Sequence, residues 1–74
     1  MVQLFDRVVL TQDMPGKNLK QGDVGTVVMI HHKGEGYEVE FFTLEGKTYT
    51  VETLLAHHIR PVKTNEITHV RELT

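Results

Sequence analysis

The sequence predicts a small all-β domain: a five-stranded, SH3-like, partly open barrel with a short 3-10 turn and an ordered C-terminal tail. A chain of 74 residues has room for one domain. Strand-length runs of β-branched and aromatic residues alternate with glycine-rich turns. In the clearest run, residues 37–42, apolar residues alternate with Glu38 and Glu40. This period of two is typical of a strand with one buried and one solvated face.

Two predicted strands and a long loop make up the first half of the chain. Residues 7–10 (RVVL) are apolar and mostly β-branched, and we expect them to form the first strand. Residues 11–23 follow as a loop with Pro-Gly and Gly-Asp turn dipeptides. Residues 25–31 (GTVVMIH) are expected to form a central strand, because apolar residues occur on both of its faces. Loops as long as the one over residues 11–23 often carry functional residues.

The second half continues the β pattern, with one interruption. Glycine-containing turns separate residues 37–42 from the segments around them, and residues 48–51 (TYTV) are predicted to form the fourth strand. Residues 52–58 (ETLLAHH) break the alternation and have the length of a single 3-10 turn. Residues 59–62 (IRPV) are expected to form a closing strand at an edge, because Pro61 cannot donate a ladder hydrogen bond.

These elements predict a barrel over residues 1–62 and a tail over residues 63–74. The tail is charged but contains Ile67, Val70 and Leu73, so we expect it to dock on its own barrel or on a neighbouring chain. The expected core consists of apolar residues from every predicted strand and from the 3-10 turn. Its members are Val8, Leu10, Val27, Met29, Val39, Phe41, Tyr49, Val51, Leu54 and Ile59.

Composition weighs against several classes of function. The net charge of −2 is unlike the basic balance of most small nucleic-acid modules. The sequence has no cysteine, so disulfides and thiolate metal sites are absent. It shows no apolar run of the ~20 residues that a membrane span needs, and no signal-peptide pattern. We therefore expect a cytoplasmic protein that does not enter the membrane.

Few residues suggest catalysis. The chain has no serine and no cysteine, so the usual Ser and Cys nucleophiles are missing. Glu38 and Glu40 share one strand face, which we expect to be solvated rather than to form an acid–base pair. Adjacent histidines in a strand point to opposite faces, so neither His31-His32 nor His57-His58 is expected to chelate one ion. We predict no enzyme activity, no cofactor and no metal site.

The segment KQGDVGTVVMI, residues 20–30, resembles the glycine-centred turn of KOW-type modules in ribosomal proteins and transcription elongation factors. That resemblance implies an RNA or ribosome contact. Such modules bring flanking basic residues, whereas here only Lys17, Lys20 and Lys33 are nearby. If RNA binding is the function, these lysines and Arg60 should converge on one face, and binding should weaken with salt.

A wider resemblance rests on GDVGTVV, residues 22–28, and YEVEF, residues 37–41. With the residues around them, these motifs resemble a family of short bacterial proteins described as a domain of unknown function, over roughly residues 4–62. The resemblance implies a small SH3-like barrel and assigns no activity. Some family members lie beside toxin-like genes, so the resemblance also implies an antitoxin or immunity role.

The sequence therefore favours a non-catalytic protein-binding module, with RNA contact as the alternative. The expected partner is another protein or a second copy of the chain. Contact would involve a sheet edge, the loop of residues 11–23 and the tail. An apolar patch around Phe5, Phe42 or Leu54 and Leu55, and basic contacts from Lys17, Lys20 and Arg60, are the candidate binding residues.

Overall fold

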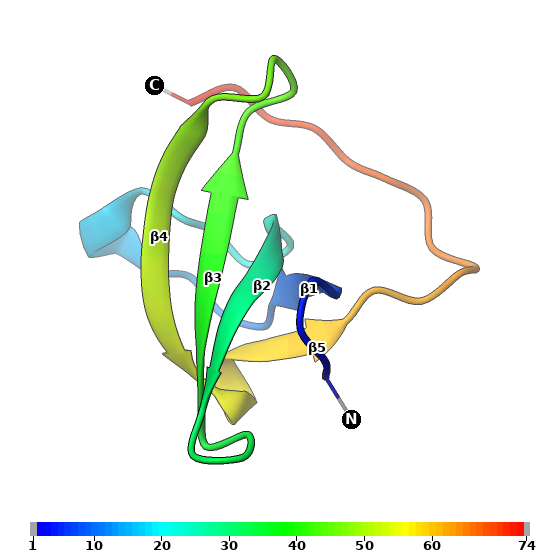
Figure 1. Ribbon diagram of the computed structural model, residues 1–74. Helices are drawn as coiled ribbons and strands as arrows, with labels where there is room; N and C mark the ends of the chain where they lie inside the picture. The colour runs from blue at the N-terminus through cyan, green and yellow to red at the C-terminus, as the bar shows by residue number, and fades with distance from the viewer. Residues whose placement is uncertain (1, 74) are drawn as a thin grey trace.

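The computed structural model describes residues 2–73, which form an antiparallel sheet of five strands in the order β4-β3-β2-β1-β5 (Figure 1). The elements are β1 (Arg7–Leu10), η1 (Pro15–Lys17), β2 (Val24–His31), β3 (Gly36–Phe42), β4 (Thr48–Leu55), η2 (Ala56–His58) and β5 (Ile59–Pro61). Within these residues, β4 and β5 are unpaired edges, and η1 and η2 are short 3-10 turns. The predicted all-β, partly open barrel architecture is confirmed. No helix in the described part of the chain is long and apolar enough to cross a membrane.

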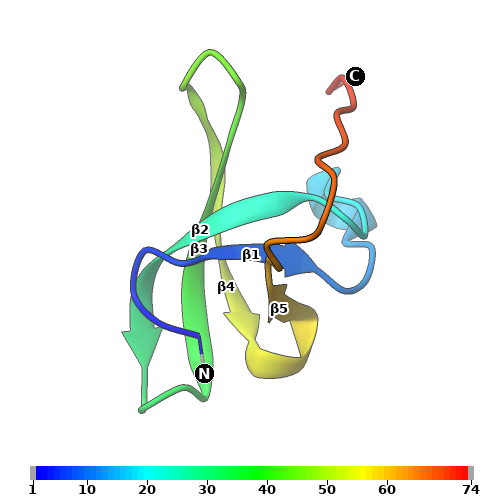
Figure 2. The ribbon, with the colours of Figure 1, turned by 90° about the vertical axis from the view of Figure 1, so that its right-hand side faces the viewer.

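The sheet curves around one apolar core. In Figure 2, β3 and β4 run nearly vertically whereas β1 and much of β2 run across them, so the sheet folds over itself. The core side chains come from all five strands and from the loop after β1. They are Val8, Leu10, Leu19, Val27, Tyr37, Val39, Phe41, Leu54 and Ile59.

The loop between β1 and β2 is tied back against the barrel. The backbone N–H of Leu10 donates to the carbonyl of Asp23, and the N–H of Gly22 donates to the carbonyl of Leu10. Within the loop, Met14 and Leu19 form an isolated β-bridge. This bridge places Leu19 in the core, a contribution that the sequence did not reveal because Leu19 is a lone apolar residue among polar ones.

A β-bulge in β2 makes the prediction of a buried Met29 wrong. Val27 pairs with Val39, but Met29 pairs with Glu38, so Val28 is an extra residue in the ladder. The extra residue reverses the inward and outward alternation. Met29 therefore faces solvent beside Glu38, and it is about half exposed.

The predictions that Tyr49 and Val51 are buried are also wrong. In the β3–β4 ladder, Leu54 lies opposite Tyr37 and Glu52 lies opposite Val39, so these two residues of β4 face inward and Val51 and Thr53 face outward. Val51 faces outward and is half exposed. The ladder also extends β4 to Leu55. The 3-10 turn therefore occupies only residues 56–58, whereas the whole segment 52–58 was expected to leave the sheet.

Gly25 is the glycine at which an added side chain would be most crowded. A Cβ at this position would lie 2.5 Å from Val39 Cγ1 and 3.0 Å from the carbonyl oxygen of Glu40. Glycine is required here because β2 and β3 leave no room for a side chain, and not because of an unusual φ angle. A Cβ on Gly16, by contrast, would meet nothing within 4 Å.

Replacing Gly25 by alanine should therefore lower the free energy of unfolding by about 1–3 kcal/mol through overpacking. Gly16→Ala is the matched control and should change it by about 0.5 kcal/mol or less. Urea denaturation followed by circular dichroism measures both. Equal stability of the two variants would contradict the close β2–β3 approach.

The adjacent leucines at the end of β4 test its register. Leu54→Ala removes a fully buried side chain and should cost about 2–5 kcal/mol. Leu55→Ala changes a half-exposed side chain and should cost about 0.5 kcal/mol or less. Thermal unfolding of both variants checks the difference, and a larger loss for Leu55→Ala would mean that the register is inverted.

Candidate protein-binding surface

The side of the sheet that faces away from the core, called here the outer face, carries a mixed apolar and acidic surface. The register aligns Arg7, Thr26, Glu40 and Val51 as successive cross-strand partners. The next row holds Met29, Glu38 and Thr53. Partners in a ladder project to the same side, so β2, β3 and β4 present these residues together.

Large apolar side chains are exposed on this face. On β2, β3 and β4 they are Val24, Met29, Phe42, Val51 and Leu55, each about 40–50% exposed. Such side chains scattered singly are ordinary on a protein surface, but their concentration on one face is typical of a contact surface. Arg7 adds to it, because its guanidinium carbon lies 5.5 Å from the centre of the Phe42 ring.

The two outward carboxylates are held by neighbouring side chains. Thr53 Oγ1 donates to Glu38 Oε2 at 2.7 Å, and His31 Nε2 lies 2.8 Å from the same oxygen. Thr48 Oγ1 donates to Glu40 Oε2 at 2.5 Å. The Thr53 hydroxyl and the His31 imidazole hold the pKa of Glu38 below its ordinary value. Glu38 is thus suited to attract a cation rather than to donate a proton.

The apolar candidates from the sequence fall in different places. Phe42 and Leu55 lie on the outer face. Phe5 precedes β1 and is 68% exposed; its backbone has φ 70°, and its N–H donates to the carbonyl of Val27. A positive φ is costly for an aromatic residue. Leu54 is fully buried opposite Tyr37, so the prediction that it belongs to a surface patch is wrong. Alternation along the strand exposes only one of the two adjacent leucines, Leu55.

The basic candidates do not form one cluster. Lys17 and Lys20 lie before β2 and Lys33 lies after it, so the length of an eight-residue strand separates them. Lys17 Nζ lies 3.9 Å from Glu52 Oε1. Arg60 gives both terminal nitrogens to Glu66, at 2.8 and 2.7 Å.

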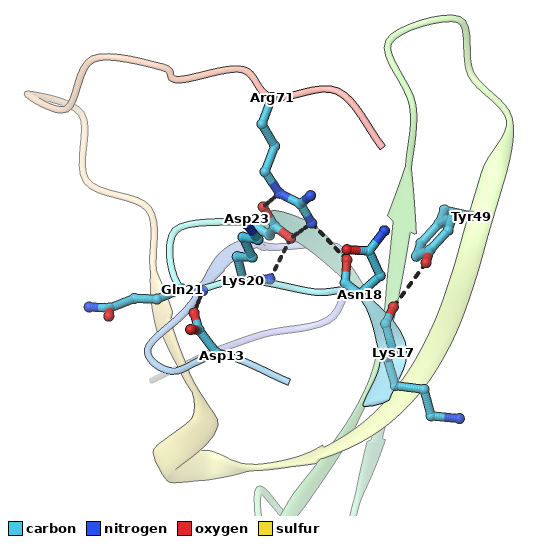
Figure 3. Close-up of polar contacts among 8 residues, drawn as sticks. All are labelled: Asp13, Lys17, Asn18, Lys20, Gln21, Asp23, Tyr49 and Arg71. Atoms are coloured by element: carbon cyan, nitrogen blue, oxygen red, sulfur yellow. Dashed lines mark hydrogen bonds and ion pairs between the residues drawn. The ribbon is translucent and has the colours of Figure 1, made fainter. Parts of the chain in front are cut away.

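A second polar site joins the tail to the loop after β1 (Figure 3). Arg71 Nε donates to Asp23 Oδ1 at 2.8 Å, and Nη2 donates to Asp23 Oδ2 at 2.6 Å and to the carbonyl of Asn18 at 2.8 Å. Nearby, Tyr49 Oη donates to the carbonyl of Lys17. Sequence reasoning missed this pair, because 48 residues separate Asp23 from Arg71 and no local motif signals it.

The tail is held by charges and not by the apolar residues that suggested docking. Ile67 and Val70 are 96% and 69% exposed. The tail contacts the barrel through Arg71 and through Glu66, whose carboxylate accepts from Arg60 and from the N–H of Lys63. The Arg60 hydrogen bonds, helped by that N–H, lower the pKa of Glu66 to about 2.

Asp23 also stays ionised in spite of its surroundings. Partial burial of the carboxyl, the largest single influence, acts to raise its pKa. Hydrogen bonds from Arg71 and from the N–H of Lys20 together outweigh burial, and the pKa of Asp23 is lowered. Among residues 2–73, no group of three or more histidine, aspartate or glutamate side chains is placed to hold a metal ion.

Comparison with known proteins gives a family without an assigned activity. The sequence model of one family, described as Domain of unknown function (DUF4926), matches residues 4–61. No curated protein and no solved structure matches the chain significantly. The matched residues include the outer face and Asp23, whereas the whole tail, with Glu66 and Arg71, lies beyond them.

The Glu66 ion pair predicts a pH dependence. A carboxyl whose pKa falls from 4.5 to about 2 on folding stabilises the folded state fully above about pH 4.5 and loses this contribution as the pH falls toward 2. NMR of the Glu66 carboxyl carbon should therefore show a midpoint near 2. In the Arg60→Gln variant the midpoint should move toward 4.5, and a midpoint near 4.5 in the unaltered protein would contradict the pair.

Proposed function

We propose a function from the surface of the protein, because the chain belongs to a family that is described only as a domain of unknown function (DUF4926). The protein is a non-catalytic, cytoplasmic protein-binding module. It binds through the outer face of the sheet. The observation that carries this proposal is the set of half-exposed apolar side chains on β2, β3 and β4, which lie on the same face as the carboxylates of Glu38 and Glu40.

The composition of the face fits a protein partner better than a small molecule. Methionine and aromatic residues are enriched at protein interfaces, and Met29 and Phe42 are both half exposed here. The face is an open sheet surface without an enclosing cavity of the kind that small ligands require. Glu38 and Glu40 would then select a partner that presents basic groups among apolar ones.

The biological role that we propose is to cap or inhibit a protein encoded by a neighbouring bacterial gene, as an antitoxin or immunity protein does. The family resemblance and the small size of the chain support this role. A second copy of the chain is the other occupant that the face would accept. Light scattering separates the two, because they give a heteromer and a homodimer.

RNA contact has less support. That function needs Lys17, Lys20, Lys33 and Arg60 on one surface. The length of β2 separates Lys33 from the two loop lysines, and Glu66 takes both terminal nitrogens of Arg60. The carboxylates on the outer face would also repel a phosphate backbone.

The test is size-exclusion chromatography with light scattering on protein expressed with its neighbouring genes. We expect a complex for the unaltered protein and loss of that complex in the Met29→Arg/Val51→Arg double variant, because two charges then occupy the apolar surface. Leu44→Arg, at a 92% exposed position in the β3–β4 hairpin, is the control and should keep the partner.

Two outcomes would contradict the proposal. One is a lone monomer for the unaltered protein under these conditions. The other is a complex that survives in the double variant, which would move the contact to another surface. Circular dichroism of each variant confirms that a lost complex reflects lost contact and not unfolding.

A further inference from the structure

The site that holds Arg71 is built by the family-matched part of the chain. The N–H of Lys20 donates to Asp23 Oδ2 at 2.9 Å, and the N–H of Asp23 donates back to the carbonyl of Lys20. Asp23 is also joined to β1, because its carbonyl accepts from Leu10. These bonds fix the carboxylate without any contribution from the tail, so the acceptor is preorganised.

A second acceptor points to the same place. Asn18 ends η1 in the left-handed region, with φ 53° and ψ 38°, and its carbonyl accepts from Arg71 Nη2. The carboxylate of Asp13 accepts from the N–H of Gln21. It also attracts the Arg71 guanidinium electrostatically. A planar guanidinium satisfies this set of acceptors, whereas an ammonium group provides only a point charge.

The segment that carries Arg71 buries no residue against the barrel. Arg71 lies ten residues beyond the family match, and none of residues 62–73 is buried. Figures 1 and 2 show the tail leaving the end of β5 and passing outside the sheet before it reaches the loop. Arg71 can therefore leave its site without disturbing the core.

Space for further contacts lies on the same loop that holds Arg71. A hollow of about 180 Å³ is lined by Asp13, Pro15, Asn18, Leu19 and Lys20, and three of these, Asp13, Asn18 and Lys20, also belong to the Arg71 surroundings described above. A peptide that places an arginine on Asp23 would bring a neighbouring side chain to this hollow. The site thus has an occupied arginine position and an adjacent place for one more residue.

We propose that Asp23 and the Asn18 carbonyl form a receptor for an arginine side chain, and that a partner protein displaces Arg71 by presenting an arginine-bearing segment. The tail is then an intramolecular ligand that occupies the receptor until the partner arrives. The charge and hydrogen-bond geometry of the bound Arg71 identify the chemistry of the partner residue. This inference does not depend on the outer-face proposal.

The experiment titrates a blocked peptide, acetyl-THVREL-amide with the sequence of residues 68–73, into the full-length Arg71→Gln variant and into the unaltered protein. Backbone amide NMR signals of Lys20 and Asp23 report binding. One partly exposed ion pair is weak, so we expect a Kd of about millimolar for the variant. The unaltered protein, whose own tail competes, should bind about fivefold more weakly or worse.

Two controls make the result decisive. A peptide with glutamine in place of arginine should not bind the Arg71→Gln variant. Adding Asp23→Asn should also abolish binding, since asparagine can still accept from the Lys20 N–H but lacks the charge. Equal binding of both peptides, equal affinity of the unaltered protein and the Arg71→Gln variant, or undiminished binding after Asp23→Asn would each overturn the proposal. The Met29→Arg/Val51→Arg variant should leave the peptide affinity of the Arg71→Gln chain unchanged.

Discussion

The alternation along β3 is the constraint on which the rest of the structure depends. Tyr37, Val39 and Phe41 enter the core, and Glu38 and Glu40 consequently point outward. Turning the strand over would bury two carboxylates, a cost that no pairing within so small a core could offset. Since β3 is hydrogen-bonded to both β2 and β4, its orientation determines which side chains of those strands face solvent.

This constraint explains both the successes and the failures of sequence reasoning. The strands, their order along the chain and most of the core follow from alternation and turn residues. The failures concern Met29, Tyr49 and Val51, which are apolar yet exposed. Local pattern cannot reveal a bulge at Val28, nor that β4 turns Glu52 inward, because both are decided by register against β3. Met29 and Val51, which were wrongly placed in the core, are thus among the apolar residues of the outer face.

The candidate binding residues divide in the same way. An exposed aromatic at Phe42 could be anticipated, since it follows the alternating run directly. The link between Asp23 and Arg71 could not be anticipated, because it depends on how the loop after β1 folds back and on the path that the tail takes past this loop. Local sequence determines the Asp23 turn, but only the three-dimensional fold brings Arg71 to it. Two features therefore stand apart: a sheet face defined by register, and an arginine site defined by tertiary contact.

A protein partner that covers the outer face would shield Val51 from solvent. The chain has no cysteine, so single cysteines can be introduced as reporters without background labelling. In the Val51→Cys protein, the rate of maleimide labelling should be high for the free chain and should fall strongly in the complex. Leu44→Cys, in the β3–β4 hairpin, should label equally fast in both states. Undiminished labelling at position 51 in a complex whose stoichiometry is confirmed would mean that the partner does not cover the outer face.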